Sequence, residues 1–164
     1  MLGKSNEREN EMRIRQVTNN LEKQNVTRLI LEALPDWFGI PEARKGYITE
    51  STDKIFFCAY DQDKPVGFLY LKETGNSTVE LYVMGVLIEY HRNGIGRELF
   101  NSAKKAAREK GYSFIQVKTV QMGKYEEYDR TNKFYLSLGF KEFEVFPALW
   151  GEQNPCQIYV MSLK

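Results

Sequence analysis

Residues 86–97 read Val86-Leu87-Ile88-Glu89-Tyr90-His91-Arg92-Asn93-Gly94-Ile95-Gly96-Arg97, in which an apolar strand enters a short basic turn and continues into a helix. Gly94 and Gly96 carry no side chain, so a ligand can approach the backbone closely here. The helix directs unpaired N–H groups and the positive end of its dipole to the same place. The pattern predicts an anion-binding turn, which consists of Arg92, Asn93, Gly94, Ile95, Gly96 and Arg97.

Two common nucleotide-binding signatures do not fit this turn. The dinucleotide signature G-x-G-x-x-G fails because its third glycine position is Leu99. The phosphate-loop signature is also absent, since Gly3-Lys4-Ser5 has neither the preceding strand nor the first glycine. A glycine pair after a strand is a weak signal alone, so a second motif is needed.

The segment His91–Gly96 resembles the R/Q-x-x-G-x-G/A signature with which the GNAT acyltransferase superfamily binds acetyl-coenzyme A, although His91 departs from its first position. A second segment, Thr131-Asn132-Lys133-Phe134-Tyr135-Leu136-Ser137-Leu138-Gly139-Phe140, resembles the A-x-x-[FL]-Y-x-x-x-G-F block that follows the family's fifth strand. The two motifs occur in the family's order, and the resemblance extends over nearly the whole chain from Met12. It implies a GNAT-type acyl-CoA N-acyltransferase fold and acetyl-coenzyme A (acetyl-CoA) as co-substrate.

Composition indicates one globular domain. The chain has 164 residues, 42% hydrophobic and 27% charged, with a net charge of +1, which argues against nucleic-acid binding. No apolar run is long enough to span a membrane, and the polar start does not resemble a signal peptide, so we expect a cytoplasmic protein. We expect a flexible polar extension over residues 1–11 and a single acetyltransferase domain over residues 12–164.

Hydrophobic periodicity and turn residues predict an α/β fold. The predicted helices cover residues 18–34, 41–48, 94–110 and 129–138. The predicted strands cover residues 12–17, 55–60, 66–71, 78–88, 113–120, 140–146 and 157–161. We therefore expect a mixed central sheet of about seven strands flanked by four helices; in the GNAT family, coenzyme A enters between the fourth and fifth strands.

The resemblance implies two catalytic residues. Tyr135 matches the tyrosine of the second motif, which serves as general acid for the departing thiolate; alternatively it is a buried aromatic residue of the core. Glu80 lies eleven residues before the first motif position, the spacing of the base glutamate in the histone-acetylating branch of the family. Burial in an apolar strand would raise the pKa of Glu80. The alternatives are an exposed glutamate at a strand end and a proton relay through water.

The resemblance also places cofactor-binding backbone amides at Met84, Gly85 and Val86, near the reacting carbonyl oxygen. Gly85 fits a β-bulge, although a packing glycine is an alternative. Tyr128 stands seven residues before Tyr135, where the family often has an asparagine that contacts the pantetheine arm. Asn132 is therefore not expected to inherit that role.

The acceptor side is predicted at two segments, whose candidate residues are Trp37, Phe38, Glu127 and Tyr128. Aromatic rings beside carboxylates suit a cationic amine, although a solvated acidic loop has the same composition. The sequence does not choose between a polyamine, an amino sugar, an aminoglycoside, an amino acid and a protein terminus, and it leaves homodimerisation open.

His91 is the single histidine, which excludes a multi-histidine metal site, and we expect no metal. Cys58 and Cys156 have no histidine partner in the sequence pattern, which disfavours a covalent route. We therefore expect an N-acetyltransferase that moves the acetyl group of acetyl-CoA directly to a primary amine in a ternary complex. The alternative is a non-catalytic acyl-CoA sensor or structural subunit with the same fold.

Overall fold

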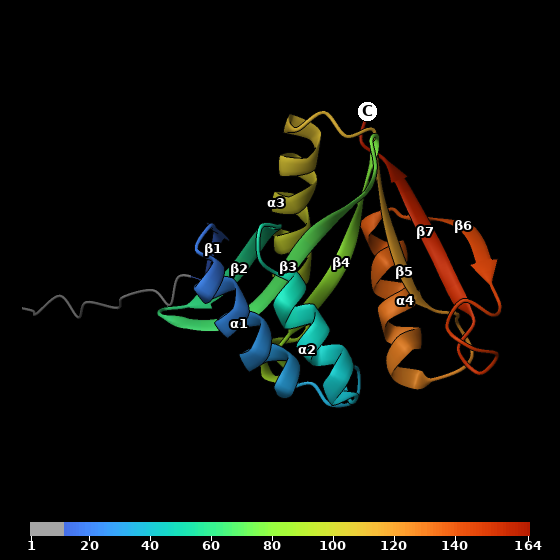
Figure 1. Ribbon diagram of the computed structural model, residues 1–164, viewed down its shortest axis with the longest axis horizontal. Coiled ribbons are helices and arrows are strands. Elements are labelled where there is room, and N and C mark those ends of the chain that lie inside the picture. The colour runs from blue at the N-terminus through green and yellow to red at the C-terminus, as the bar shows by residue number, and fades with distance from the viewer. Residues whose placement is uncertain (1–11) are drawn as a thin grey trace, which may run out of the picture.

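The computed structural model describes residues 12–164, and the predicted extension over residues 1–11 lies outside them. The described residues form one seven-stranded sheet in the order β1-β2-β3-β4-β5-β7-β6 (Figure 1). Its strands are β1 Met12–Val17, β2 Ile55–Asp61, β3 Lys64–Gly75, β4 Thr78–Val86, β5 Phe114–Val120, β6 Lys141–Phe146 and β7 Cys156–Ser162. The helices are α1 Asn20–Glu32, α2 Pro41–Glu50, the 3-10 helix η1 Ile88–Tyr90, α3 Ile95–Glu109 and α4 Glu126–Leu138. The predicted mixed sheet with four flanking α-helices is thus confirmed.

Several boundaries differ from the predictions; the start of α4 and the end of β4 are the ones next to the site. Helix α4 begins at Glu126 rather than Asp129, because Glu126, Glu127 and Asp129 together favour the positive end of the helix dipole. Strand β4 ends at Val86 rather than Ile88, since Ile88 begins η1. Apolar periodicity does not separate a strand end from a short apolar 3-10 turn.

Strands β4 and β5 are the parallel pair in the sheet, and their pairing is short. Thr78–Glu80 pairs with Phe114–Gln116, and beyond these residues the two strands separate, as Figure 1 shows. The edge of β4 that faces β5 is therefore unpaired with β5 from Leu81 onward. Backbone N–H groups along this edge remain available to a ligand.

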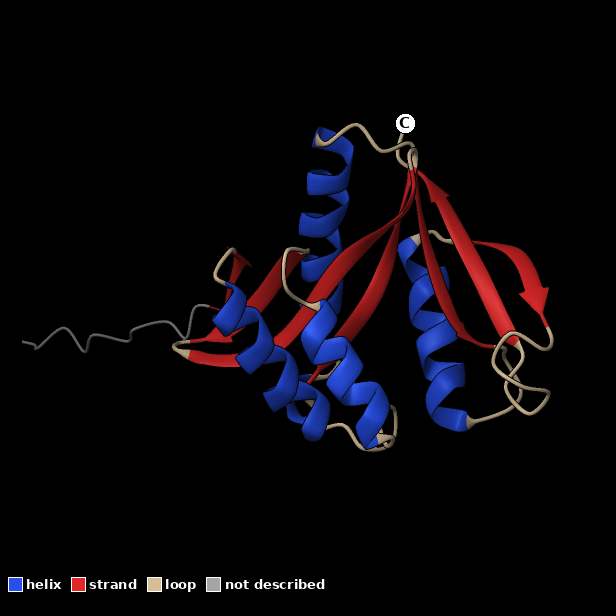
Figure 2. Cartoon of the chain, in the orientation of Figure 1, coloured by secondary structure: helices blue, strands red, loops and turns tan. Residues whose placement is uncertain are grey.

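Helices cover both faces of the sheet. Figure 2 shows α1 and α2 in front of the strands and α3 behind them. Gly85 makes the close approach of α1 possible, since a Cβ atom there would lie 3.0 Å from both Ile30 Cγ2 and Leu34 Cδ1. It pairs regularly with Phe68, so the expectation of a bulge at Gly85 is wrong. The register instead shifts around Tyr82, and Gly85 is a packing glycine.

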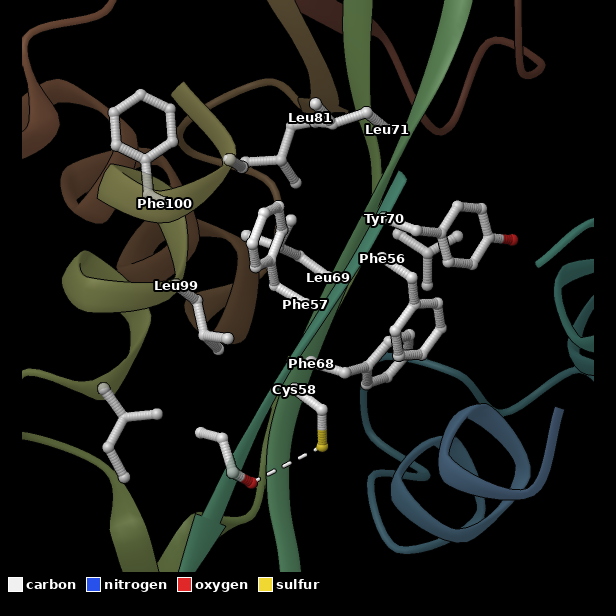
Figure 3. Packing of buried hydrophobic residues seen from close by; sticks show 14 of the residues in the cluster. Phe56, Phe57, Cys58, Phe68, Leu69, Tyr70, Leu71, Leu81, Leu99 and Phe100 are labelled. Carbon is white, nitrogen blue, oxygen red and sulfur yellow. Dashed lines mark hydrogen bonds between the residues drawn. The ribbon is translucent and has the colours of Figure 1, made fainter. Parts of the chain in front are cut away.

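The core between α1, α2 and the sheet is aromatic. The rings of Phe56 and Phe68 stack with centroids 5.4 Å apart, and those of Phe56 and Tyr70 with centroids 5.9 Å apart. Figure 3 shows Cys58 among these side chains, its thiol donating to the carbonyl of Ala59. Cys58 is thus part of the core and is fully buried.

Candidate functional site

The predicted anion-binding turn leads directly into α3. Gly94 precedes the helix with φ 76°, and no side chain caps the N–H groups of the first turn. A Cβ atom at Gly94 would meet nothing within 4 Å, so the backbone is open there. At Gly96 a Cβ atom would lie 2.9 Å from Phe134 Cζ and 3.1 Å from Met84 Cε. Gly94 leaves the turn accessible, and Gly96 allows α3 to lie close to α4 and β4.

Arg97 of this turn and His91, which precedes it, have protein partners. Arg97 donates to the backbone carbonyl and the hydroxyl of Ser137 at 3.2 and 3.3 Å, which links α3 to α4. The His91 Nε2 atom lies 2.6 Å from the carbonyl oxygen of Val86, and its ring lies edge-on to Trp37. These contacts fix the turn at the end of β4, and an anion would be held chiefly by the backbone and by Arg92.

Glu80 lies at the last paired position of β4 before β4 and β5 separate. Its side chain is buried, and its carboxylate lies 3.1 Å from the Lys118 ammonium, which reaches across from β5. Burial raises the pKa of Glu80, and the nearby charge of Lys118 opposes that effect in part. Glu80 is therefore a carboxylate whose pKa is raised toward the range that suits a general base.

Lys118 is absent from the residues that the sequence predicted for the site. A lysine in the middle of β5, a strand that alternates apolar and polar residues from Ile115 to Lys118, is a signal that could have indicated it. The lysine of an exposed strand face gives the same signal, however, and its pairing with Glu80 depends on the register of two strands that are distant in the sequence.

Glu80 faces the side of the sheet that α2 covers. It pairs directly with Lys72 of β3, and residues paired in this way point to the same face. The Lys72 ammonium lies 3.1 Å from the carboxylate of Glu50 in α2. The Glu80 and Lys118 side chains therefore lie on the α2 side.

Tyr135 belongs to α4, and its ring lies against Phe140 and Tyr159. Burial raises the pKa of Tyr135, and the Glu80 carboxylate is the next largest cause, so the two groups are electrostatic neighbours. Phe140 also packs against Phe100 of α3, which places Tyr135 on the face of the sheet that α3 covers. The phenol stays protonated at neutral pH and can donate a proton.

The candidate base and acid thus lie on opposite sides of the sheet, and Glu80 lies where β4 and β5 separate. Met84, Gly85 and Val86 lie along β4 beyond the last pair with β5, and the anion-binding turn follows them. This order suits an extended ligand that has an anionic end at Gly94 and a reacting group near Glu80 and Tyr135.

The predicted acceptor residues lie together. The Trp37 indole donates to the backbone carbonyl of Glu127 at 3.4 Å, and the Tyr128 hydroxyl donates to the carbonyl of Trp37 at 3.2 Å. Phe38 lies edge-on to Tyr47 of α2. These contacts join the segment between α1 and α2 to the first turn of α4.

The side chain of Asn132 is buried and hydrogen-bonded within the protein. Its amide donates to the carbonyls of Val120 and Tyr128, and its oxygen accepts from the hydroxyl of Tyr159. These bonds use its side chain to connect α4 with β5 and β7.

Neither cysteine has the environment of a nucleophile. Burial raises the pKa of Cys58 to about 12 and that of Cys156 to about 11, so both are thiols at neutral pH. Within residues 12–164, no three His, Cys, Asp or Glu side chains are grouped to bind a metal ion. No helix of that range has the length and apolar composition of a membrane span.

Two surface hollows lie elsewhere, around β1, β2 and α1. Their volumes are about 420 and 430 Å³, and they are lined by residues such as Met12, Arg13, Leu21 and Tyr60. They contain none of the predicted site residues. Neither hollow is lined by Glu80, by Tyr135 or by any residue of the anion-binding turn.

Comparisons with known proteins agree with this architecture. A sequence model of the acetyltransferase (GNAT) domain matches residues 52–142, more than half of the chain. No curated protein matches the sequence.

Solved structures share the fold. A Desulfovibrio desulfuricans protein assigned to the GNAT acetyltransferases has a TM-score of 0.83 at 18% identity, covering 94% of this chain and 100% of its own. The aminoglycoside 6'-N-acetyltransferase of Enterococcus faecium has a TM-score of 0.74 at 22% identity, covering 93% and 98%. The PaiA N-acetyltransferase of Thermoplasma acidophilum, solved with coenzyme A, has a TM-score of 0.69 at 18% identity, covering 92% and 99%.

Proposed function

The chain belongs to the GNAT acetyltransferase family, and from this premise we propose that it transfers the acetyl group of acetyl-CoA to a primary amine, directly and within a ternary complex. The observation that carries the proposal is that Glu80 lies buried at the point where β4 and β5 separate, with Tyr135 as its electrostatic neighbour. An open, uncapped helix start at Gly94 lies at the far end of β4.

Each part has a role in the proposed reaction. The N–H groups around Gly94 and the positive end of α3 would bind the pyrophosphate of the coenzyme, together with Arg92. Backbone N–H groups at Met84, Gly85 and Val86 would donate to the pantetheine arm and to the oxyanion. That edge of β4 is unpaired with β5, which supports this assignment.

Glu80 would accept the proton of the acceptor ammonium. A lysine-like amine has a pKa of about 10.4, so its neutral form at pH 7 costs about 4.6 kcal/mol. The amine nitrogen then attacks the thioester carbon, the carbon–sulfur bond breaks, and Tyr135 donates a proton to the departing thiolate. The proton that the nitrogen loses as it becomes an amide returns to Tyr135. The products are an amide and free coenzyme A.

Direct transfer is supported by the state of the cysteines. Cys58 and Cys156 are both buried thiols at neutral pH, and His91 lies against Val86 rather than against either of them. A covalent acetyl-enzyme would need a thiolate and a base beside it. The juxtaposition of Trp37, Glu127 and Tyr128 supports an acceptor site near the start of α4.

The experiment is a calorimetric titration of acetyl-CoA into the protein, followed by a panel of primary amines with detection of free thiol. Binding with thiol release for at least one amine class supports the proposal. Binding without release for any amine favours the second candidate, a non-catalytic acyl-CoA sensor, and absence of binding contradicts both.

A further inference from the structure

The carboxylates on the α2 side of the site are already paired with lysines of the chain. Glu80 lies 3.1 Å from Lys118, and Glu50 lies 3.1 Å from Lys72. The Lys72 ammonium also lies 4.5 Å from the centre of the Tyr82 ring, where a cation is attracted to the π-system. The negative charge of each carboxylate is therefore already balanced by a lysine, and neither is free to pair with an acceptor that carries only a positive charge.

The two members of the Glu80–Lys118 pair differ in exposure. The Glu80 side chain is 5% exposed and that of Lys118 is 30% exposed, so the carboxylate is enclosed while the ammonium reaches solvent. A lysine ammonium has three N–H donors. Within residues 12–164, Glu80 is the one ion-pair or hydrogen-bond partner of Lys118. Two donors therefore remain for a bound anion.

The enclosed pair restricts which amine can bind to Glu80. A simple ammonium that replaced Lys118 at this carboxylate would leave the lysine charge without a partner, which is costly in a partly buried site. A molecule that carries an ammonium and a carboxylate close together avoids this cost. Its ammonium pairs with Glu80, its carboxylate pairs with Lys118, and no charge is left alone.

We propose that the acceptor is an amine with an adjacent carboxylate, as in a free α-amino acid, and that Lys118 binds this carboxylate while Glu80 accepts the proton of the amine. In an α-amino acid one carbon atom separates the amine from the carboxylate, so both groups can meet two side chains that are themselves in contact. This inference rests on the proposed N-acetyltransferase function and names its substrate class.

The test compares each common α-amino acid with its carboxamide as acceptor, at saturating acetyl-CoA. We expect kcat/KM, expressed per concentration of neutral amine, to be about 10- to 100-fold higher for the acid, the effect of one charged hydrogen-bonded contact. Lys118→Met should reduce this acid-to-amide ratio to near one, and Lys118→Arg should keep most of it. Taking the ratio removes any common effect that Lys118 has through Glu80.

Lys72→Met is the matched control, because Lys72 also pairs with a carboxylate on the same side of the sheet at the same distance. Its acid-to-amide ratio should equal that of the unaltered protein. Calorimetry of each acid and amide with the protein saturated in coenzyme A gives the same comparison without turnover.

Carboxamides or amines without a carboxylate that react as well as the acids would overturn the substrate class and leave the N-acetyltransferase function intact. A Lys118→Met variant that keeps the acid-to-amide ratio of the unaltered protein would also overturn it, since Lys118 would then not bind the carboxylate of the acceptor. A protein that acetylates no amine contradicts the proposed function as well.

Discussion

The Glu80 carboxylate and the Lys118 ammonium lie 3.1 Å apart, across the two parallel strands at the point where these separate. Burial and the lysine act on the pKa of Glu80 in opposite directions, and burial is the larger cause. The balance of these two effects sets the pH range in which Glu80 can accept a proton.

The first prediction concerns this pH range. If the carboxylate of Glu80 is the active form, activity falls as the pH drops through a pKa that lies above that of an ordinary glutamate. Lys118→Met removes the charge that favours the carboxylate, so the acidic limb of the kcat/KM profile should move to higher pH. Lys118→Arg should leave the limb near its original place, and an identical limb in all three proteins would mean that another group titrates.

The second prediction concerns Tyr135. Tyr135→Phe removes one hydroxyl and keeps the ring that lies between Phe140 and Tyr159. The kcat should fall about 100-fold, the usual size of general acid catalysis, with little change in the affinity for acetyl-CoA. Tyr112→Phe serves as the control, since Tyr112 bonds Glu73 away from the site. Equal turnover by both variants would show that Tyr135 is a packing residue.

The third prediction concerns the anion-binding turn. Gly94 has φ 76°, a conformation that Asn and Asp tolerate better than other residues. Gly94→Asp adds a negative charge where the pyrophosphate is expected, and Gly94→Asn is its neutral isostere. Calorimetry with acetyl-CoA should show at least a tenfold greater loss of affinity for Gly94→Asp than for Gly94→Asn. Equal affinities would place the phosphates elsewhere.

The fourth prediction concerns stability. Gly85→Val would force side-chain atoms against Ile30 and Leu34 of α1 and should lower the free energy of unfolding by about 1–3 kcal/mol. Gly75→Ala, another strand glycine, meets nothing within 4 Å and should change it by less than about 0.5 kcal/mol. Thermal unfolding followed by circular dichroism measures both, and an unaffected Gly85→Val protein would contradict the close approach of α1.

Much of the fold could be predicted because the signals are local. Alternation marks the strands, and the break from apolar strand to two-glycine turn marks the start of α3. The family resemblance indicated Tyr135 and Glu80, and in the structure Glu80 lies at the separation of β4 and β5 with Tyr135 as its electrostatic neighbour. Their catalytic roles remain predictions.

The rest depends on contacts between distant segments. Lys118 could not be assigned because its partner lies on another strand, and the packing role of Gly85 depends on α1. Leu87 and Ile88 continue the apolar run of β4 into the 3-10 turn, so periodicity extended β4 too far. The contact between Trp37 and Tyr128 joins the segment after α1 to α4, and these two segments are far apart in the sequence.

Direct transfer in a ternary complex is tested most directly by the mass of the intact protein, measured with free thiol, after mixing with acetyl-CoA in the presence and absence of an acceptor amine. The account predicts that thiol is released only with the amine, that the acetyl group appears on the amine, and that the mass of the protein does not change. A protein that becomes heavier by one acetyl group without amine, and loses that mass when amine is added, would contradict it.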